Sequence, residues 1–232
     1  MDAIILAGGF GTRLRSVVSD VPKPMALVAN KPFLSYLLEY LSKHQISSVV
    51  LCTGYKHEVI ESYFSSSYKN MDIKYSVEDE PLGTGGAIKK AFELIESDSA
   101  LILNGDTLFN IELSEFIVHH QLQQSDVSVA LKYLTDYDRY GSIVLNENKI
   151  IGFEEKKHKD NGLINGGVYI VKKTVLNEGN LPIAFSFEKE ILEKKLNKLN
   201  VIGYKSTSYF IDIGIPEDYE KAQKEVKELF NA

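Results

Sequence analysis

A glycine-rich segment near the N-terminus is the part of this chain best suited to chemistry. It reads Leu6-Ala7-Gly8-Gly9-Phe10-Gly11-Thr12-Arg13-Leu14 and directly follows a short apolar run. Glycines at the end of a buried strand let the backbone approach a ligand closely, and successive N–H groups form a cradle for an anion. The planar guanidinium of Arg13 can hold phosphate oxygens through two hydrogen bonds. The segment therefore predicts a phosphate-binding loop.

Lys23 adds a second positive charge to this loop. It stands between Pro22 and Pro24, which restrict its backbone, and it offers phosphate a point charge. Arginine is rare, with Arg13, Arg15 and Arg139 against 23 lysines, so an arginine beside the glycines indicates that bidentate geometry is needed. Arg15 is equally consistent with a solvated surface side chain. Together these residues predict a site for a nucleoside triphosphate.

The order Gly-Gly-x-Gly-Thr-Arg-Leu followed by Pro-Lys-Pro resembles the signature of the sugar-1-phosphate nucleotidylyltransferases, which make nucleotide-diphosphate sugars. A dinucleotide-binding loop would need glycine at Leu14, and no Gly-x4-Gly-Lys-Ser/Thr string occurs. The resemblance implies that Arg13, Lys23 and Lys156 are catalytic. It also implies that the nucleotide contacts Leu6, Ala7, Gly8, Gly9, Gly11, Thr12, Arg13, Lys23, Gly83, Thr84, Gly85 and Asp106.

Two aspartates follow apolar runs and are candidate metal ligands. On spacing alone, Asn104-Gly105-Asp106 is better interpreted as a turn, but in the resembling family a Gly-Asp at this strand end binds magnesium. Asp212 lies in Phe210-Ile211-Asp212-Ile213-Gly214, similar to the segment that supplies the family's second metal-binding aspartate, although Ile215 replaces its threonine. Two carboxylates with phosphate oxygens suit Mg²⁺, with Mn²⁺ as the alternative.

The segment Leu82-Gly83-Thr84-Gly85-Gly86 is a second glycine-rich element. Taken alone it is a plain helix start, whereas in similar enzymes this loop lies against the nucleobase and ribose. That role implies that Gly85 and Gly86 let the flat ring come close. Glu80 is expected to face the same site.

Three elements of the second half resemble the family's sugar-phosphate site. Phe153-Glu154-Glu155-Lys156 resembles a Glu-Lys-Pro element, with Lys157 in place of the proline, in which the glutamate binds sugar hydroxyls and the lysine the phosphate. An Asn-x-Gly strand and a Tyr-Gly element of the family are matched in the same half. The resemblance thus implies a sugar-phosphate site made of Gly141, Glu155, Lys156 and Asn165.

Alternating apolar runs and helical patterns position these residues. Strands are expected near 2–6, 48–53, 72–77 and 99–104, with helices near 33–44, 56–65 and 86–96. This alternation predicts an α/β fold: a Rossmann-like, mostly parallel sheet with helices on both faces, which the resemblance makes glycosyltransferase-A-like. Ligands of such sheets bind beyond the carboxyl ends of the strands.

The second half has closer strands, near 126–132, 142–146, 150–155, 164–172 and 200–213, with helices near 112–122 and 186–195. It is expected to form a small mixed β extension over the ligand edge. We expect one domain, 1–232, with a nucleotide-binding half of about 1–110 and a sugar-binding half of about 111–232. A last helix, starting at Pro216, packs on the core or on another subunit, which leaves a homodimer open.

Composition excludes several other classes. A net charge of −6 provides no basic footprint for nucleic acid. The single cysteine, Cys52, lies in an apolar run, is expected in the core and leaves no intrachain disulfide, which fits a cytoplasmic protein. No signal peptide and no apolar stretch of about 18 residues is recognisable, so membrane insertion is not expected.

Within the family, the motifs resemble most those of D-glycero-D-manno-heptose 1-phosphate guanylyltransferases, which implies GTP and D-glycero-α-D-manno-heptose 1-phosphate as substrates. Mannose 1-phosphate guanylyltransferases are next, followed by uridylyl- and thymidylyltransferases acting on muramate or glucose phosphates. Two other classes stay open: a glycosyltransferase using a finished nucleotide sugar, and a non-catalytic sensor of nucleotide sugars.

Overall fold

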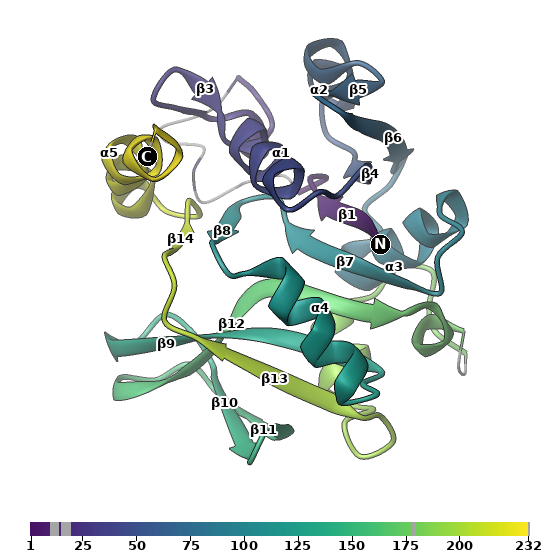
Figure 1. Ribbon diagram of the computed structural model, residues 1–232, viewed down its shortest axis with the longest axis vertical. Coiled ribbons are helices and arrows are strands. Elements are labelled where there is room, and N and C mark those ends of the chain that lie inside the picture. The colour runs from purple at the N-terminus through teal and green to yellow at the C-terminus, as the bar shows by residue number, and fades with distance from the viewer. Residues whose placement is uncertain (10–13, 15–19, 178–179, 232) are drawn as a thin grey trace.

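Strands from both halves of the chain join in one ten-stranded mixed sheet (Figure 1). The computed structural model describes residues 1–9, 14, 20–177 and 180–231. From one edge of the sheet, the second half contributes β10 (Ser142–Asn146), β11 (Lys149–Glu154), β13 (Val201–Ser206), β9 (Val127–Tyr137) and β12 (Lys159–Lys172). The first half continues it with β7 (Ser99–Asn104), β1 (Asp2–Leu6), β4 (Ser48–Thr53), β6 (Met71–Val77) and β5 (Ser67–Tyr68).

The parallel part of the sheet lies mainly in the first half. There β7, β1, β4 and β6 pair in parallel, as their apolar sequences predict. The 14-residue β12 then pairs antiparallel with β7 through its last residues and with β9 along most of its length. The mixed extension expected from the sequence is therefore a continuation of the same sheet, because β12 belongs to both parts.

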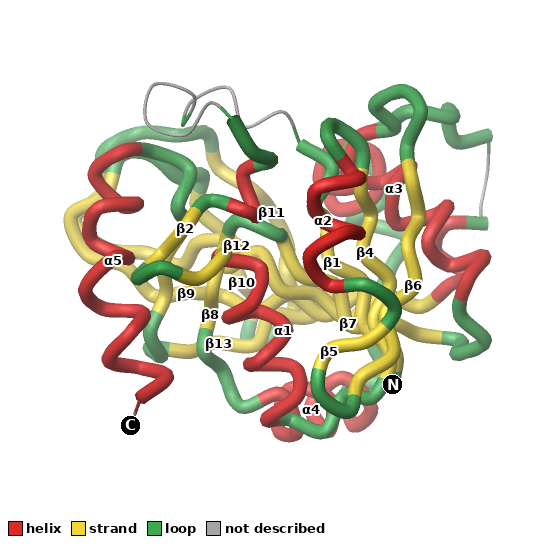
Figure 2. The backbone as a smooth tube through the Cα atoms, turned by 90° about the horizontal axis from the view of Figure 1, so that it is seen from above, coloured by secondary structure: helices red, strands yellow, loops and turns green. Residues whose placement is uncertain are grey.

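Helices cover both faces of the sheet (Figure 2), which confirms the predicted α/β class. Successive residues of β1 point to opposite faces: Ile5 is buried in one apolar cluster and Ile4 in the other. On the Ile5 face lie α1 (Phe33–Lys43), α2 (His57–Phe64), α4 (Leu113–Leu122) and α5 (Pro216–Asn231). On the Ile4 face lie α3 (Gly83–Ala91) and η4, a π-helical turn (Glu188–Glu193).

The last helix, α5, packs on the chain's own core. It begins at Pro216, as predicted, and its Ala222 and Val226 are fully buried in the Ile5-face cluster. Its polar side attaches to β2 (Leu27–Val28), because Tyr219 OH and Gln223 Nε2 donate hydrogen bonds of 2.6 and 2.7 Å to the Leu27 carbonyl. Residues 216–231 therefore hold the short hairpin that follows Lys23.

Cys52 is a core residue, as expected. Its side chain is fully buried, its Sγ lies 3.6 Å from the Ala87 carbonyl oxygen, and burial raises the pKa of the thiol far above its ordinary value. Of the helices in the described ranges, none is both long and apolar enough to cross a bilayer.

Candidate active site

Asp106 is positioned by the ends of β7 and β1. The Gly105 N–H donates to the Leu6 carbonyl at 3.0 Å, and a Cβ atom at Gly105 would lie 2.5 Å from that oxygen. Only glycine permits this close approach of the two strand ends. The chain then turns into β8 (Thr107–Phe109), so Asp106 lies at the carboxyl edge of the parallel strands. This is the edge where the topology predicts a ligand.

Asp212 reaches the same edge from 106 positions further along the chain. β14 (Phe210–Asp212) pairs antiparallel with β8 and places Asp212 opposite Thr107. The Gly214 N–H donates a 2.8 Å hydrogen bond to Asp212 Oδ1, and a Cβ atom at Gly214 would lie 2.8 Å from the same oxygen. Glycine at this position therefore lets the chain bend tightly around the carboxylate.

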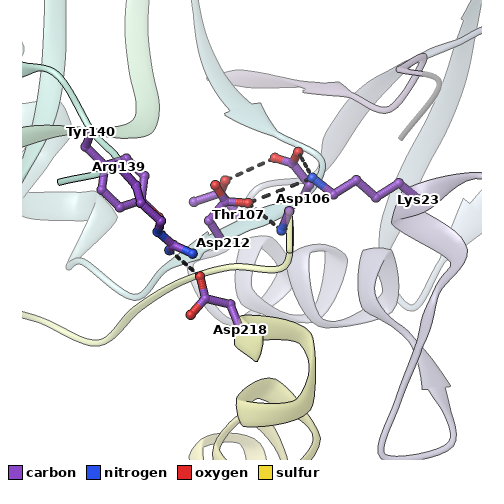
Figure 3. Close-up of polar contacts among 8 residues, drawn as sticks. Lys23, Asp106, Thr107, Arg139, Tyr140, Asp212 and Asp218 are labelled. Carbon is purple, nitrogen blue, oxygen red and sulfur yellow. Dashed lines mark hydrogen bonds and ion pairs between the residues drawn. The ribbon is translucent and has the colours of Figure 1, made fainter. Parts of the chain in front are cut away.

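Lys23 joins the two aspartates (Figure 3). Its Nζ lies 2.5 Å from Asp106 Oδ2 and 3.8 Å from Asp212 Oδ1, and its side chain is only 9% exposed. The short 3-10 turn Lys23–Met25 directs the side chain inward, and the buried Pro24 and Met25 anchor that turn in the core. The structure thus brings together three residues that the sequence assigned to one site.

A cavity of about 300 Å³ opens beside Asp106, and its lining includes most of the described residues that the sequence assigned to the nucleotide. Ala7 is not among them: it is almost fully buried, and its N–H donates to the Cys52 carbonyl at 2.8 Å. Gly11, Thr12 and Arg13 lie outside the described residues. The cavity is lined by Leu6, Gly8, Gly9, Glu78, Pro81, Gly83, Thr84, Ala87, Asn104 and Asp106.

Gly85 and Gly86 have a packing role in the structure, while their contact with the nucleobase stays a prediction. A Cβ atom at Gly85 would lie 2.1 Å from the Phe185 ring, and one at Gly86 would lie 2.5 Å from the Ile183 carbonyl oxygen. The Gly85 N–H already donates to the Phe185 carbonyl at 2.9 Å. Both glycines therefore let the start of α3 contact the segment before η4, and Gly85 does not line the cavity.

Glu78 is a site residue that the sequence analysis missed. It follows β6, lines the cavity and is half-buried, and this burial raises the pKa of its carboxyl group. One carboxylate oxygen accepts a 2.9 Å hydrogen bond from the Leu82 N–H, and a Cβ atom at Gly8 would lie 2.9 Å from the other. Glu80, which was expected to face the site, is exposed and does not line the cavity.

A second cavity, of about 700 Å³, lies among the strands of the second half. All four residues that the sequence assigned to the sugar phosphate line it: Gly141, Glu155, Lys156 and Asn165. The Asn165 side chain is fixed by the protein, because Oδ1 accepts from the Gly167 N–H at 3.0 Å and Nδ2 donates to Tyr169 OH at 2.9 Å. One amide hydrogen and one lone pair of Asn165 remain for a ligand.

Arg139 connects residues 138–141, the segment between β9 and β10, to α5 (Figure 3). Its guanidinium forms an ion pair with Asp218 and lies 5.4 Å from the centre of the Tyr140 ring. The Tyr140 ring packs against Phe210, and burial with the nearby Asp212 charge raises the pKa of Tyr140 to about 12. This contact places the predicted Gly141 element next to the strand that carries Asp212.

Residues 2–228 match the family of nucleotidyl transferases. The chain belongs to that family. This nucleotidyl transferase is 50% identical over 227 residues to the D-glycero-alpha-D-manno-heptose 1-phosphate guanylyltransferase of Aneurinibacillus thermoaerophilus, with 98% of this chain and 99% of the relative covered. Identity to the enzyme of the same name from Campylobacter jejuni is 48% over 220 residues, covering 94% and 97%.

Solved structures include a similar molecule. HddC from Yersinia pseudotuberculosis, complexed with GMP-PN, matches this nucleotidyl transferase with a TM-score of 0.87 at 38% identity, covering 97% of this chain and 99% of that one. The resemblance indicated by the glycine-rich and Pro-Lys-Pro motifs is thereby confirmed.

Proposed function

We propose that this nucleotidyl transferase moves a guanylyl group from GTP to D-glycero-α-D-manno-heptose 1-phosphate, giving GDP-heptose and pyrophosphate. The observation that carries the proposal is the position of the Lys23, Asp106 and Asp212 cluster beside a cavity lined by first-half residues, with a second cavity in the same sheet. Among the residues that the structure describes, those lining the first cavity fall between 6 and 106 and those lining the second between 141 and 196. This separation supports a nucleotide half and a sugar half.

The reaction needs little acid–base assistance. A phosphate monoester has a second pKa near ~6, so the sugar phosphate is already a nucleophile at neutral pH. Its oxygen attacks the α-phosphorus of the triphosphate, and the bond to the pyrophosphate oxygen breaks. The barrier arises from repulsion between anions and from charge developing on the leaving group, so positioning and electrostatics supply the catalysis. Lys156 lines the second cavity and is the proposed partner of the attacking phosphate.

Lys23 and Arg13 are assigned to the triphosphate. The Lys23 ammonium group offsets part of the charge of the two aspartates in this structure and would turn to phosphate oxygens if a metal cation bound them. Arg13 rests on the sequence motif alone, because it lies outside the described residues.

The aspartates fit a magnesium ion that arrives with phosphate. They already surround one positive charge, the Lys23 ammonium group, at 2.5 and 3.8 Å. Among the described residues no three His, Cys, Asp or Glu side chains form a metal cage. Mg²⁺ is characteristically held by one or two carboxylates plus substrate phosphates and water, and Mn²⁺ accepts similar ligands. When bound between Asp106 and Asp212, the ion would neutralise developing phosphate charge.

Glu78 supports guanine as the base. An ionised carboxylate only accepts hydrogen bonds, and guanine presents two adjacent donors, N1–H and the N2 amino group. Adenine and the pyrimidines do not offer that pair of donors on one edge. Glu78 lines the cavity together with Gly83 and Thr84 and accepts a hydrogen bond from the Leu82 N–H, so it lies next to the loop that the resemblance assigns to the base.

The decisive experiment is a matrix of four nucleoside triphosphates against heptose, mannose, glucose and muramate 1-phosphates, measured as pyrophosphate release with Mg²⁺. We expect the largest kcat/KM for GTP with the heptose phosphate. A larger value for another pair would replace the proposed substrates, and no release with any pair would favour a non-catalytic nucleotide-sugar sensor.

A further inference from the structure

Glu188 lies at the centre of a hydrogen-bond network that connects the two cavities. It is the first residue of η4 and lines the larger cavity. Its Oε2 accepts hydrogen bonds from Thr84 Oγ1 at 2.7 Å and from Ser186 Oγ at 2.8 Å. Its Oε1 accepts a 3.4 Å bond from Tyr169 OH. The carboxylate thus touches one residue of the nucleotide cavity, Thr84, and a tyrosine that leads to the sugar cavity.

The Glu188 carboxylate determines which group donates and which accepts in each hydrogen bond of this network. A carboxylate cannot donate, so the hydroxyls of Thr84 and Tyr169 must both point their hydrogens at it. The Thr84 oxygen then accepts from the Phe187 N–H at 2.8 Å. The Tyr169 oxygen likewise accepts from Asn165 Nδ2 at 2.9 Å. The Asn165 amide is therefore oriented from two sides: the Gly167 N–H bonds to its oxygen, and Tyr169, which donates to Glu188, accepts from its nitrogen.

Because Tyr169 is buried, changing the donor and acceptor roles in its hydrogen bonds would be costly. Tyr169 is 1% exposed, so water cannot replace a lost partner of its hydroxyl group. Burial, followed by the Glu188 charge, raises the pKa of the Tyr169 phenol far above its ordinary value, which keeps the hydroxyl group a donor. At the other end, backbone hydrogen bonds of 2.8 and 2.9 Å join Phe185 to Leu82 and Gly85. These bonds attach the segment before Glu188 to the start of α3.

We propose that Glu188 is a positioning residue that couples binding of the nucleotide to binding of the sugar phosphate. A ligand against Thr84 fixes the α3 loop, the loop fixes Glu188, and Glu188 orients the Asn165 amide toward the sugar. The inference rests on the proposed two-cavity function. It concerns only the coupling between the cavities and not the identity of either substrate.

Four substitutions test the links of this network. Glu188→Gln keeps one carbonyl oxygen for Thr84 and Ser186 but turns an amino group toward Tyr169, which reverses the polarity on the Asn165 side. Thr84→Val removes the hydroxyl group on the nucleotide side, and Thr84→Ser restores it. Glu190→Gln is the matched control, because Glu190 lies in the same turn and its carboxylate pairs with Lys194 at 2.7 Å.

The measurement is the dissociation constant of the sugar 1-phosphate, by calorimetry, with and without a GTP analogue that carries an uncleavable imide between the α- and β-phosphates. We expect the wild-type protein to bind the sugar phosphate about fivefold or more tightly with the analogue present. In Thr84→Val the ratio of the two dissociation constants, with and without the analogue, should fall to about one. The affinity for the sugar phosphate without nucleotide should stay unchanged. Glu188→Gln should weaken sugar-phosphate binding about tenfold and leave nucleotide affinity within twofold. Thr84→Ser and Glu190→Gln should behave like the wild type.

A ratio near one in the wild-type protein, or an unchanged ratio in both Thr84→Val and Glu188→Gln, would overturn the coupling. Thermal unfolding of each variant distinguishes a coupling defect from misfolding, since a merely structural role lowers stability without altering the ratio. If the substrate matrix selects another nucleotide and sugar, the same ratio is measured with that pair. Failure of the proposed substrates is thus distinct from failure of the coupling.

Discussion

The Lys23 ammonium group lies 2.5 Å from the Asp106 carboxylate, although 83 positions separate the two residues. Asp212 lies on the other side of the same nitrogen, at 3.8 Å. Two carboxylates so close together would repel one another without a cation between them. The Lys23 ammonium group therefore holds the two carboxylates close together in this structure.

Replacing Lys23 should reduce turnover far more than it reduces stability. We expect Lys23→Met to reduce kcat/KM about 100-fold or more, because it removes a charge that stabilises the growing negative charge on the triphosphate. The methionine keeps most of the apolar stem but leaves the two carboxylates without their cation, so we expect a lower unfolding temperature with the fold retained. Lys31→Met, which removes a lysine paired with Glu39 at 2.6 Å, is the control. Near-normal pyrophosphate release by Lys23→Met would refute its assigned role.

Activity should require a divalent cation. Asp106→Asn and Asp212→Asn keep the side-chain shape but remove the charge that binds the ion, so each should be nearly inactive. Adding Mg²⁺ or Mn²⁺ to chelator-treated wild-type protein should restore pyrophosphate release. Asp72→Asn, at an exposed position on β6, should retain full activity. Turnover that continues in excess chelator would mean that the two aspartates are structural.

Glu78 should select the base. Glu78→Gln replaces one acceptor oxygen with a donor, which opposes guanine's donors, so kcat/KM for GTP should fall about 10- to 100-fold while that for ATP stays low. Because burial raises the pKa of Glu78, GTP affinity should weaken with acid at a higher pH than an ordinary glutamate would produce. Glu80→Gln, two residues away and exposed, is the matched control. Unchanged GTP preference in Glu78→Gln would assign base recognition elsewhere.

Asn165 should act on the sugar alone. Asn165→Ala removes an amide that lines the larger cavity and leaves buried partners unpaired, so KM for the heptose phosphate should rise about tenfold or more. The affinity for GTP without sugar, measured by calorimetry, should stay within a few-fold. Loss of GTP binding would place Asn165 in the nucleotide site instead.

His120 should make stability fall in acid. It is 5% exposed and bonded to Ser128 Oγ at 2.8 Å, and burial with the nearby Lys172 charge lowers its pKa to about 4 from 6.5. Between pH 4 and pH 6.5, His120 is therefore protonated in the unfolded chain and neutral in the folded chain. The stability contribution is therefore complete above pH 6.5 and declines toward pH 4, by at most about 3 kcal/mol. His120→Gln should lose this part of the slope when free energies of unfolding are measured across that range.

The cluster of Lys23, Asp106 and Asp212 could be predicted because each member lies in a motif that resembles a known family, whereas spacing alone favoured a turn at Asp106. Asp106 directly follows Gly105, Asp212 lies two residues before Gly214, and Lys23 stands between prolines. Glu78 lies in no such motif, since it is the first of several carboxylates in Val77-Glu78-Asp79-Glu80. What distinguishes it from Glu80 is contact with Leu82 and the close approach of Gly8, which only the folded chain reveals.

In the fold too, local sequence patterns predict the elements, whereas contacts between distant residues could not be predicted. The elements of the first half follow their apolar periodicity, and the predicted strands at 2–6, 48–53 and 99–104 have the observed bounds. The sheet continues through β12 because Val168 pairs with Leu103 and Leu163 pairs with Tyr133. These partners lie far apart in the sequence, so local sequence patterns do not predict their pairing. The packing of Gly85 could not be predicted for the same reason, because its neighbour Phe185 lies 100 positions away.

The attachment of α5 to Leu27 bears on how the chain acquires activity while it is being synthesised. The hydrogen bonds from Tyr219 and Gln223 join residues 192 and 196 positions apart, and they secure the hairpin that follows Lys23. The segment from Leu27 to Gln223 must therefore leave the ribosome before these bonds can form. Lys23 is synthesised long before the helix that secures the hairpin beside it, so a nascent chain stopped short of α5 would carry the glycine-rich loop without an assembled centre.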